Sequence, residues 1–171
     1  VELCKETLLP LGIDFRAGDG KNILPFEDAS FDMIINRHGD FNVKDIHRML
    51  KDGGIFITEQ VGAENDRELV ELLLGKTELP FPKQYLEVIR KQFGDAGFEI
   101  WDAQECFRPI KFYDVGALVW FAHIIEWEFP GFSVDCCKDK LLHAQQLLEQ
   151  NGVIEGRIHR FLLVCSKSAG K

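Results

Sequence analysis

The chain has 171 residues, of which 46% are hydrophobic and 28% are charged, and this composition is typical of one globular domain. No stretch approaches the roughly 20 consecutive apolar residues of a membrane-spanning helix, and the early acidic residues do not fit a targeting peptide. The net charge of −8, with basic residues scattered among more numerous acids, argues against a surface that binds a nucleic acid backbone. We therefore expect a soluble, cytoplasmic protein with no membrane partner.

Apolar residues alternate along the chain between helical spacing and short extended runs. Glycine and proline mark most of the boundaries between these segments. In chain order, the pattern predicts a helix over 4–11, a strand over 13–17, a loop over 18–22, a strand over 31–36, a helix from 43 to the glycines at 53–54, a strand over 55–61, helices over 66–74 and 82–97, a strand over 98–104, helices over 113–127 and 135–150, and a strand over 157–166.

Strands separated by helices predict an α/β fold with a largely parallel sheet that helices cover on both faces. We expect residues 1–171 to form a single domain, in which residues 106–152 are a helical insertion before the last strand. Ligands bind beyond the carboxyl ends of the strands in such sheets. Functional side chains are therefore expected directly after each strand.

Two segments carry a resemblance to a known family. Residues 18–20, Gly-Asp-Gly, and residues 24–35, Leu-Pro-Phe-Glu-Asp-Ala-Ser-Phe-Asp-Met-Ile-Ile, resemble the third and fourth motifs of class I S-adenosylmethionine-dependent methyltransferases of the type 11-like group. Residues 47–57, His-Arg-Met-Leu-Lys-Asp-Gly-Gly-Ile-Phe-Ile, are similar to the segment before the family's fifth strand. The resemblance implies a Rossmann-like three-layer sheet, S-adenosylmethionine as cofactor, and methyl transfer to an O or N nucleophile.

The resemblance assigns cofactor binding to Asp19, Gly20 and Asn36. In the family, the position of Asp19 holds the adenine amino group, and a carboxylate is a suitable acceptor for such a donor. The alternative is that Asp19 only caps a turn, as aspartates commonly do. Asn36 ends its predicted strand, at the lip where the resemblance places the meeting point of cofactor and acceptor.

The same lip continues with Arg37 and His38, which are the candidate catalytic residues. An imidazole titrates near neutral pH and is suited to take a proton from an acceptor. Alternatively, Arg37 pairs with an acidic neighbour and His38 is a hydrogen-bonded loop residue. The five cysteines show no zinc-ligand spacing, so no metal site is expected.

Candidate substrate-binding residues come from two further places. Glu59 and Gln60 lie at the end of the strand over 55–61, so their side chains are expected at the same cleft. Trp127 and Phe129 belong to an aromatic segment inside the helical insertion, which resembles a substrate-covering lid. The alternative for these aromatic residues is a place in the hydrophobic core.

The resemblance also implies a fold that is shortened at its N-terminal side. The family's glycine-rich turn after the first strand and the acid that ends the second strand have no counterpart here, so both strands are expected to be missing. The family's strand order is 3-2-1-4-5-7-6, and the strand over 31–36 would then be an exposed edge. We expect it either to pair with a second copy in a homodimer or to be covered by the strand over 13–17.

The acceptor is expected to be a small molecule rather than a nucleic acid, in line with the acidic net charge. The first alternative is a non-catalytic methyltransferase-like remnant that self-associates. A further alternative is a protein similar to rRNA base methyltransferases.

Overall fold

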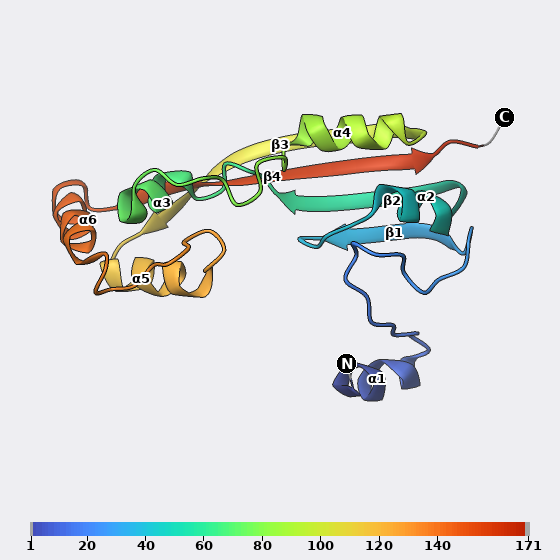
Figure 1. Cartoon of the computed structure of the whole chain (residues 1–171), viewed down its shortest axis with the longest axis horizontal. Helices are drawn as coiled ribbons and strands as arrows, with labels where there is room; N and C mark the ends of the chain where they lie inside the picture. The colour runs from blue at the N-terminus through green and yellow to red at the C-terminus, as the bar shows by residue number, and fades with distance from the viewer. Residues whose placement is uncertain (1, 170–171) are drawn as a thin grey trace. The chain divides into compact units, whose positions relative to one another are not determined.

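The computed structural model describes residues 2–169 and has the expected α/β fold (Figure 1). None of the helices in this range is both long and apolar enough to cross a bilayer. The elements in chain order are α1 (Glu2–Leu8), the 3-10 helix η1 (Leu9–Leu11), β1 (Phe31–Arg37), α2 (Val43–Met49), β2 (Leu50–Val61), α3 (Arg67–Leu74), α4 (Leu86–Asp95), β3 (Phe98–Phe112), α5 (Val115–Ile124), α6 (Lys138–Asn151) and β4 (Ile154–Lys167).

The four strands form one sheet in the order β1-β2-β4-β3. With β1 taken as the family's fourth strand, this order is the 4-5-7-6 half of the order that the resemblance implies. β4 runs antiparallel to β2, because Lys167 Nζ donates to the oxygen of Leu50 at one end (2.9 Å) and Gly62 N donates to the oxygen of His159 near the other (2.9 Å). The sheet is therefore largely parallel, as expected, with β4 as the antiparallel strand, whose direction the apolar pattern does not encode.

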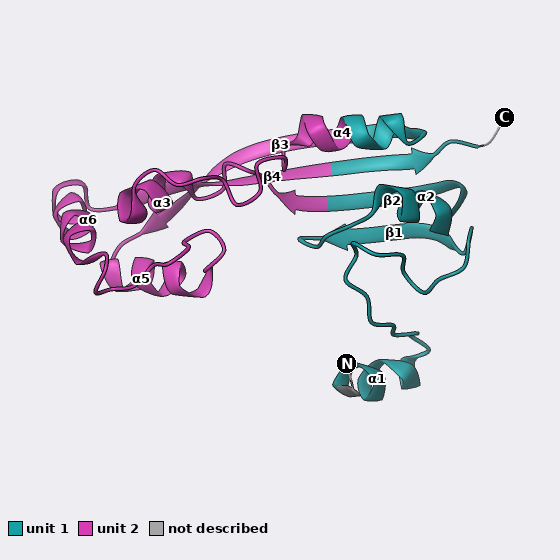
Figure 2. Ribbon diagram, viewed as in Figure 1, with its two compact units in different colours: residues 1–58, 91–102, 163–171 teal, residues 59–90, 103–162 magenta. Residues whose placement is uncertain are grey.

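The chain divides into two compact units (Figure 2). Unit 1 comprises residues 1–58, 91–102 and 163–171, and unit 2 comprises residues 59–90 and 103–162.

Aromatic rings fill the core of unit 1. The rings of Phe56 and Phe93 stack with centroids 5.1 Å apart, and Phe41 and Phe98 pack edgewise or tilted against this pair. Phe56, Phe93 and Phe98 are buried. Aromatic pairs at this spacing add to the free energy gained from burying their apolar surface.

Helix α2 (Val43–Met49) ends earlier than the sequence pattern predicts. Asn42 caps its first turn, since its side chain accepts hydrogen bonds from Lys44 N and Asp45 N. The helix ends at Met49 rather than at the glycines 53–54, because Ala29 N and Ser30 N donate to the carbonyl oxygens of Arg48 and Met49 (both 2.9 Å). These bonds satisfy the last turn, and the chain continues directly into β2.

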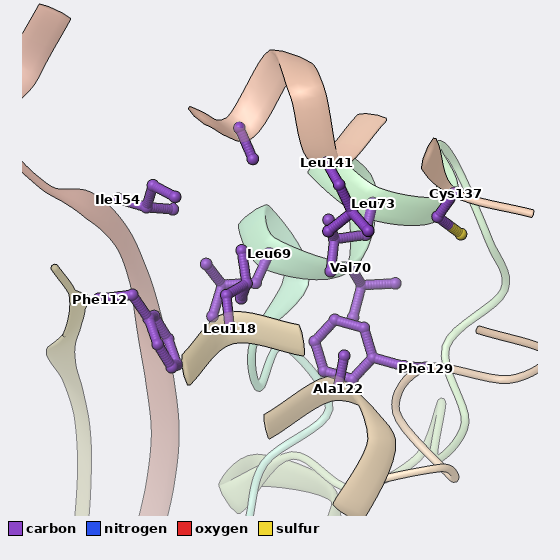
Figure 3. Close-up of a cluster of buried hydrophobic side chains, with 11 residues drawn as sticks. Leu69, Val70, Leu73, Phe112, Leu118, Ala122, Phe129, Cys137, Leu141 and Ile154 are labelled. Carbon is purple, nitrogen blue, oxygen red and sulfur yellow. The ribbon is translucent and has the colours of Figure 1, made fainter. Parts of the chain in front are cut away.

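Helices α3, α5 and α6 enclose the core of unit 2 (Figure 3). Strand β3 continues to Phe112, beyond the predicted end at 104, so the helical excursion before β4 begins with α5. The buried apolar residues of this core are Leu69, Val70, Leu73, Phe112, Leu118, Ala122, Phe129, Cys137, Leu141, Ala144 and Ile154.

The predicted strand over 13–17 does not form, and β1 has β2 as its neighbour in the sheet of the described chain. Ile13 is exposed, so burial of this residue provides no free energy to hold the segment extended against a partner. The hypothesis that this segment covers β1 is therefore wrong. The homodimer alternative stays a prediction.

Candidate functional site

A cavity of about 370 Å³ lies in unit 1, where β1 ends and the preceding loop folds against it. Its volume falls within the range of small-molecule sites. The walls combine apolar side chains with a few polar groups. The lining residues are Arg16, Gly18, Asp19, Gly20, Leu24, Phe26, Ile34, Ile35, Asn36, Gly39, Asp40, Phe41, Asn42, Asp45, Ile46, Met49 and Phe56.

Asp19 lies at the wall of this cavity and its side chain organises the loop around it. Oδ1 accepts hydrogen bonds from Lys21 N and Asn22 N (both 3.0 Å), and Oδ2 accepts from Asn22 Nδ2 (2.7 Å). These bonds, above all the one from the Asn22 backbone, lower the pKa of Asp19. The turn-capping role expected as the alternative is therefore present, and Asp19 is also one of the residues that line the cavity.

Two glycines allow the loop to approach its neighbours closely. Gly20 has a φ of 73°, and a Cβ there would overlap the carbonyl oxygen of Asp40. A Cβ at Gly18 would overlap the end of the Leu24 side chain. The loop over 18–20 is thus held against the loop over 38–42 without room for a side chain.

Asn36 connects the end of β1 to the next strand and to the following loop. Its Oδ1 accepts a hydrogen bond from Thr58 Oγ1 (3.1 Å), and its Nδ2 lies 3.4 Å from the oxygen of Asp40 as a donor. Both contacts fix the turn that carries Gly39 and Asp40 along the cavity. The predicted site residues Asp19, Gly20 and Asn36 therefore meet at one cavity.

Arg37 and His38 follow Asn36 directly but are not among the described residues that line the cavity. Arg37 is the last residue of β1, and His38 has a φ of 53°. Positive φ is uncommon outside glycine and serves here to turn the chain back toward α2. Their catalytic role stays a prediction.

Arg48 and Asp45 of α2 hold the loop that forms another wall, and sequence reasoning gave neither a role. Arg48 donates to Asp45 Oδ1 (2.8 Å), to the oxygen of Phe26 (2.6 Å) and to Asp28 Oδ1 (2.8 Å). Asp45 is buried, and its Oδ2 accepts from Leu24 N (2.9 Å). The spacing of an acid and an arginine at i and i+3 on a helix was the available signal.

The other predicted site residues lie in unit 2. Gln60 is buried, with Gln84 Nε2 3.5 Å from its side-chain oxygen, and Glu59 is half-buried. Trp127 is exposed, whereas Phe129 is buried in the hydrophobic core. The core alternative therefore describes Phe129, whose ring has no exposed face for a substrate to contact in this conformation.

The cavity suits the nucleoside part of S-adenosylmethionine. Asp19, a hydrogen-bond acceptor with a lowered pKa, lines the cavity together with the apolar side chains of Leu24, Phe26 and Phe41. An adenine ring needs apolar walls for its faces and an acceptor for its amino group. Within residues 2–169, no group of three or more His, Cys, Asp or Glu side chains is arranged to hold a metal ion.

Comparison with known sequences gives matches to methyltransferases. Residues 1–58 match the family described as a methyltransferase domain. Over 86 residues, the chain is 33% identical to the phthiotriol/phenolphthiotriol dimycocerosates methyltransferases of Mycobacterium tuberculosis and Mycobacterium bovis. This match covers 46% of the chain and 32% of the relative, so the chain spans less than a third of that relative's length.

Solved structures show the same fold over nearly the whole chain. The YcgJ protein of Bacillus subtilis has a TM-score of 0.60 at 21% identity, with 99% of this chain and 79% of that chain covered. The BH2331 protein of Bacillus halodurans C-125 has a TM-score of 0.60 at 16% identity, with 98% and 78% covered. The cyclase SpnF has a TM-score of 0.53 at 19% identity, with 99% and 61% covered.

The fold alone does not decide the reaction, because one of these similar structures is named for a cyclisation. The sequence match to the methyltransferase domain family covers residues 1–58, which contain the cavity loop and β1. This part of the chain is thus similar in sequence to methyltransferases, and the described chain shares the fold of the solved structures above.

Proposed function

We propose that this protein transfers a methyl group from S-adenosylmethionine to an O or N nucleophile of a small-molecule acceptor. The observation that carries the proposal is the cavity of unit 1, which lies within the segment that matches methyltransferases and has Asp19, Gly20 and Asn36 on its walls. When bound, the cofactor supplies a methyl group on a positively charged sulfur, which is an activated electrophile.

The chain's own residues would act by binding and orientation. The Asp19 carboxylate would accept a hydrogen bond from the adenine amino group, and Leu24 and Phe41 would exclude water from the faces of the ring. Asn36 would hold the turn after β1 in place beside the bound nucleoside. In-line positioning of acceptor and methyl group supplies much of the acceleration in such a reaction.

Calorimetric titration with S-adenosylhomocysteine tests the proposal. The wild-type chain should bind it, and Asp19→Asn should weaken binding about tenfold, because a hydrogen bond to a charged group contributes about 1.5–3 kcal/mol. The asparagine keeps an oxygen for the turn, so the loop should stay folded. Asp95→Asn, on the surface of α4, is the matched control and should leave the affinity unchanged. Equal affinity of Asp19→Asn and wild type would contradict the assigned role.

We also propose that the acceptor has an apolar part. Trp120 and Ile124 lie at i and i+4 on α5, Trp127 follows in the turn after this helix, and the three side chains are exposed by 67%, 46% and 58%. The matched mycobacterial relatives are named for phthiotriol and phenolphthiotriol dimycocerosates. Replacing Trp120 and Trp127 by serine should lower methylation of apolar phenols but not of polar amines. Trp101→Ser, at an exposed tryptophan outside this group of three residues, is the control and should change neither reaction.

One observation favours the alternative of a self-associating remnant. β1 is an edge strand of the sheet in the described chain, and Met33 and Ile35 on it are 47% and 70% exposed. An exposed apolar edge is a template for pairing with a second chain. The alternative predicts a dimer in sedimentation that Ile35→Lys dissociates, together with no binding of S-adenosylhomocysteine. A wild-type monomer would exclude it.

A further inference from the structure

The loop over 125–133, the first part of the segment that joins α5 to α6, packs into unit 2 through its residues Glu128 and Phe129. Glu128 N and Phe129 N both donate to the oxygen of Ile125 (3.0 and 3.1 Å), which closes a tight turn. The Phe129 ring lies in the hydrophobic core beside Val70 and Ala122 (Figure 3). The loop therefore stays in place only as long as its inner side remains buried.

Glu128, the residue before Phe129, is buried together with a second carboxyl group, that of Asp66. Glu128 is 2% exposed and Asp66 is 1% exposed. One amide nitrogen, Asn65 Nδ2, lies 2.6 Å from Asp66 Oδ2 and 3.4 Å from Glu128 Oε1. The remaining oxygens, Asp66 Oδ1 and Glu128 Oε2, have no hydrogen-bond partner among the described residues.

The charges around Glu128 come from α3 and β4. Arg67 of α3 donates through Nη2 to Thr77, and its Nη1 is buried without a partner among the described residues. Arg160 of β4 donates to Asn65 Oδ1 (2.6 Å) rather than to either carboxyl group. Neither arginine is therefore hydrogen-bonded to Glu128, although both favour its charged form.

Among the nearby acidic groups, the negative charge of Asp66 disfavours the charged form of Glu128. Glu68 lies on α3 and forms an ion pair with Arg157 at 2.5 Å. Burial is the largest effect: it raises the pKa of Asp66 to about 6 and that of Glu128 to about 7. Two buried carboxylates without full hydrogen bonding are costly to ionise together.

We propose that Glu128 is a proton-operated latch: with a proton taken up from solvent it holds the loop over 125–133 against Asn65 and Asp66, and loss of that proton to solvent releases the loop. When Glu128 is protonated, its carboxyl group has a hydroxyl hydrogen to donate. The two oxygens without a partner among the described residues, Asp66 Oδ1 and Glu128 Oε2, then no longer both need a hydrogen-bond donor. The charged form favours the conformation in which water reaches the carboxylate. The loop should thus open as the pH rises through neutrality, independently of whether the chain transfers methyl groups.

Hydrogen–deuterium exchange of the full chain tests the latch. Protection factors of the amides in 125–133, corrected for intrinsic exchange, should fall about tenfold between pH 5.5 and pH 7.5, because proton linkage changes an opening equilibrium by up to tenfold per pH unit. Amides of β4 should show a smaller change. Protection in 125–133 that is the same at both pH values would overturn the proposal.

Variants separate the latch from a general pH effect. Glu128→Gln, which is neutral at every pH, should keep at pH 7.5 the protection that the wild type shows at pH 5.5. Glu126→Gln, at an exposed position of the same turn, should retain the wild-type response. Asp66→Asn removes a neighbouring charge and should move the fall in protection to lower pH. The proposal would also be overturned if Glu128→Gln lost protection in 125–133 between pH 5.5 and pH 7.5 as the wild type does. The same holds if Asp66→Asn lost protection at the same pH as the wild type.

Discussion

The imidazole of His159 is fully buried in unit 2, and hydrogen bonds engage both of its nitrogens. Nδ1 lies 3.1 Å from Glu64 N and accepts its hydrogen, so Nε2 donates to Glu105 Oε1 at 2.9 Å. The Phe107 ring stacks on the imidazole with centroids 4.3 Å apart. Tyr85 donates to the Glu64 carboxylate, which raises the pKa of the tyrosine. One buried ring thus organises several polar neighbours.

Gly62 provides the space for that ring. A Cβ at this position would overlap three atoms of the His159 ring, which is buried and has no room to move aside. We expect Gly62→Ala to lower the free energy of unfolding by about 1–3 kcal/mol, as overpacking of a core does. Urea denaturation measures this.

Gly94 offers the control, because a Cβ there meets nothing within 4 Å and the residue lies in the exposed part of α4. Gly94→Ala should be neutral or stabilise by up to about 1 kcal/mol. Equal effects of the two substitutions on the free energy of unfolding would show that close packing against His159 does not cause the destabilisation by Gly62→Ala.

Arg48 is the residue on which the loop over 24–28 depends. Its guanidinium bonds to Asp45, Asp28 and the oxygen of Phe26, and no lysine reproduces this fork of donors. Arg48→Lys should destabilise unit 1 by about 1–3 kcal/mol in thermal denaturation, because buried Asp45 loses part of its hydrogen bonding. It should also weaken S-adenosylhomocysteine binding, since this loop lines the cavity.

A matched control for Arg48 is Lys91→Arg on the surface of α4, which should change stability by less than about 0.5 kcal/mol. If Arg48→Lys bound the ligand as tightly as wild type, the loop would not form the wall of the binding site.

Among the elements, α5 is apolar on nearly all sides and begins at a capped end. Asp114 accepts a hydrogen bond from Ala117 N at 2.7 Å. Asp114→Ala should lower the melting temperature through a loss of about 1 kcal/mol, whereas Asp114→Asn should cost only a few tenths, because asparagine caps as well as aspartate. Identical melting of the two variants would contradict a capping role.

Most elements were predictable from the spacing of apolar residues, because α3, α4, α5, α6, β2 and β4 each bury one side. The prediction failed where tertiary contacts decide. Backbone donors from Ala29 and Ser30 end α2 early, and the segment over 13–17 finds no strand partner in the described sheet. Neither contact leaves a local pattern in the sequence.

The residues of the candidate site were predictable only where a local sequence pattern marks them. Asp19, Gly20 and Asn36 follow from family motifs and strand ends, and the structure gathers them at one cavity. The Asp66 and Glu128 pair joins residues far apart in the chain, and each alone resembles an ordinary surface acid. Only the fold brings them to one amide nitrogen.

For the molecule as a whole, the raised pKa values of Asp66 and Glu128 set the pH dependence of stability. The folded protein holds these protons more tightly than the unfolded chain, whose values are 3.8 and 4.5. Their favourable contribution is therefore complete below about pH 4 and is lost as the pH rises through 6 and 7. The urea midpoint should be higher at pH 5.5 than at pH 8.

Other carboxylates act in the opposite sense but at lower pH. A hydrogen bond from Lys51 lowers the pKa of Asp32, and the bonds from Asn22 lower that of Asp19, so both stabilise above their ordinary values near 3.8. Stability should thus be highest near pH 4, where the contribution of Asp66 and Glu128 is still nearly complete and Asp32 and Asp19 are already ionised in the folded protein. Glu128→Gln should reduce the loss between pH 5.5 and pH 8, and an unchanged loss in this variant would contradict the assignment.

We propose that the cavity of unit 1 binds the nucleoside part of S-adenosylmethionine. Titration of the isotope-labelled chain with S-adenosylhomocysteine, followed by amide chemical shifts, locates the binding site. We expect saturable shifts at 18–20, at Asn36 and at 39–42, the residues that surround the cavity. Saturable binding that leaves these amides unmoved, or no shifts with millimolar ligand, would contradict it.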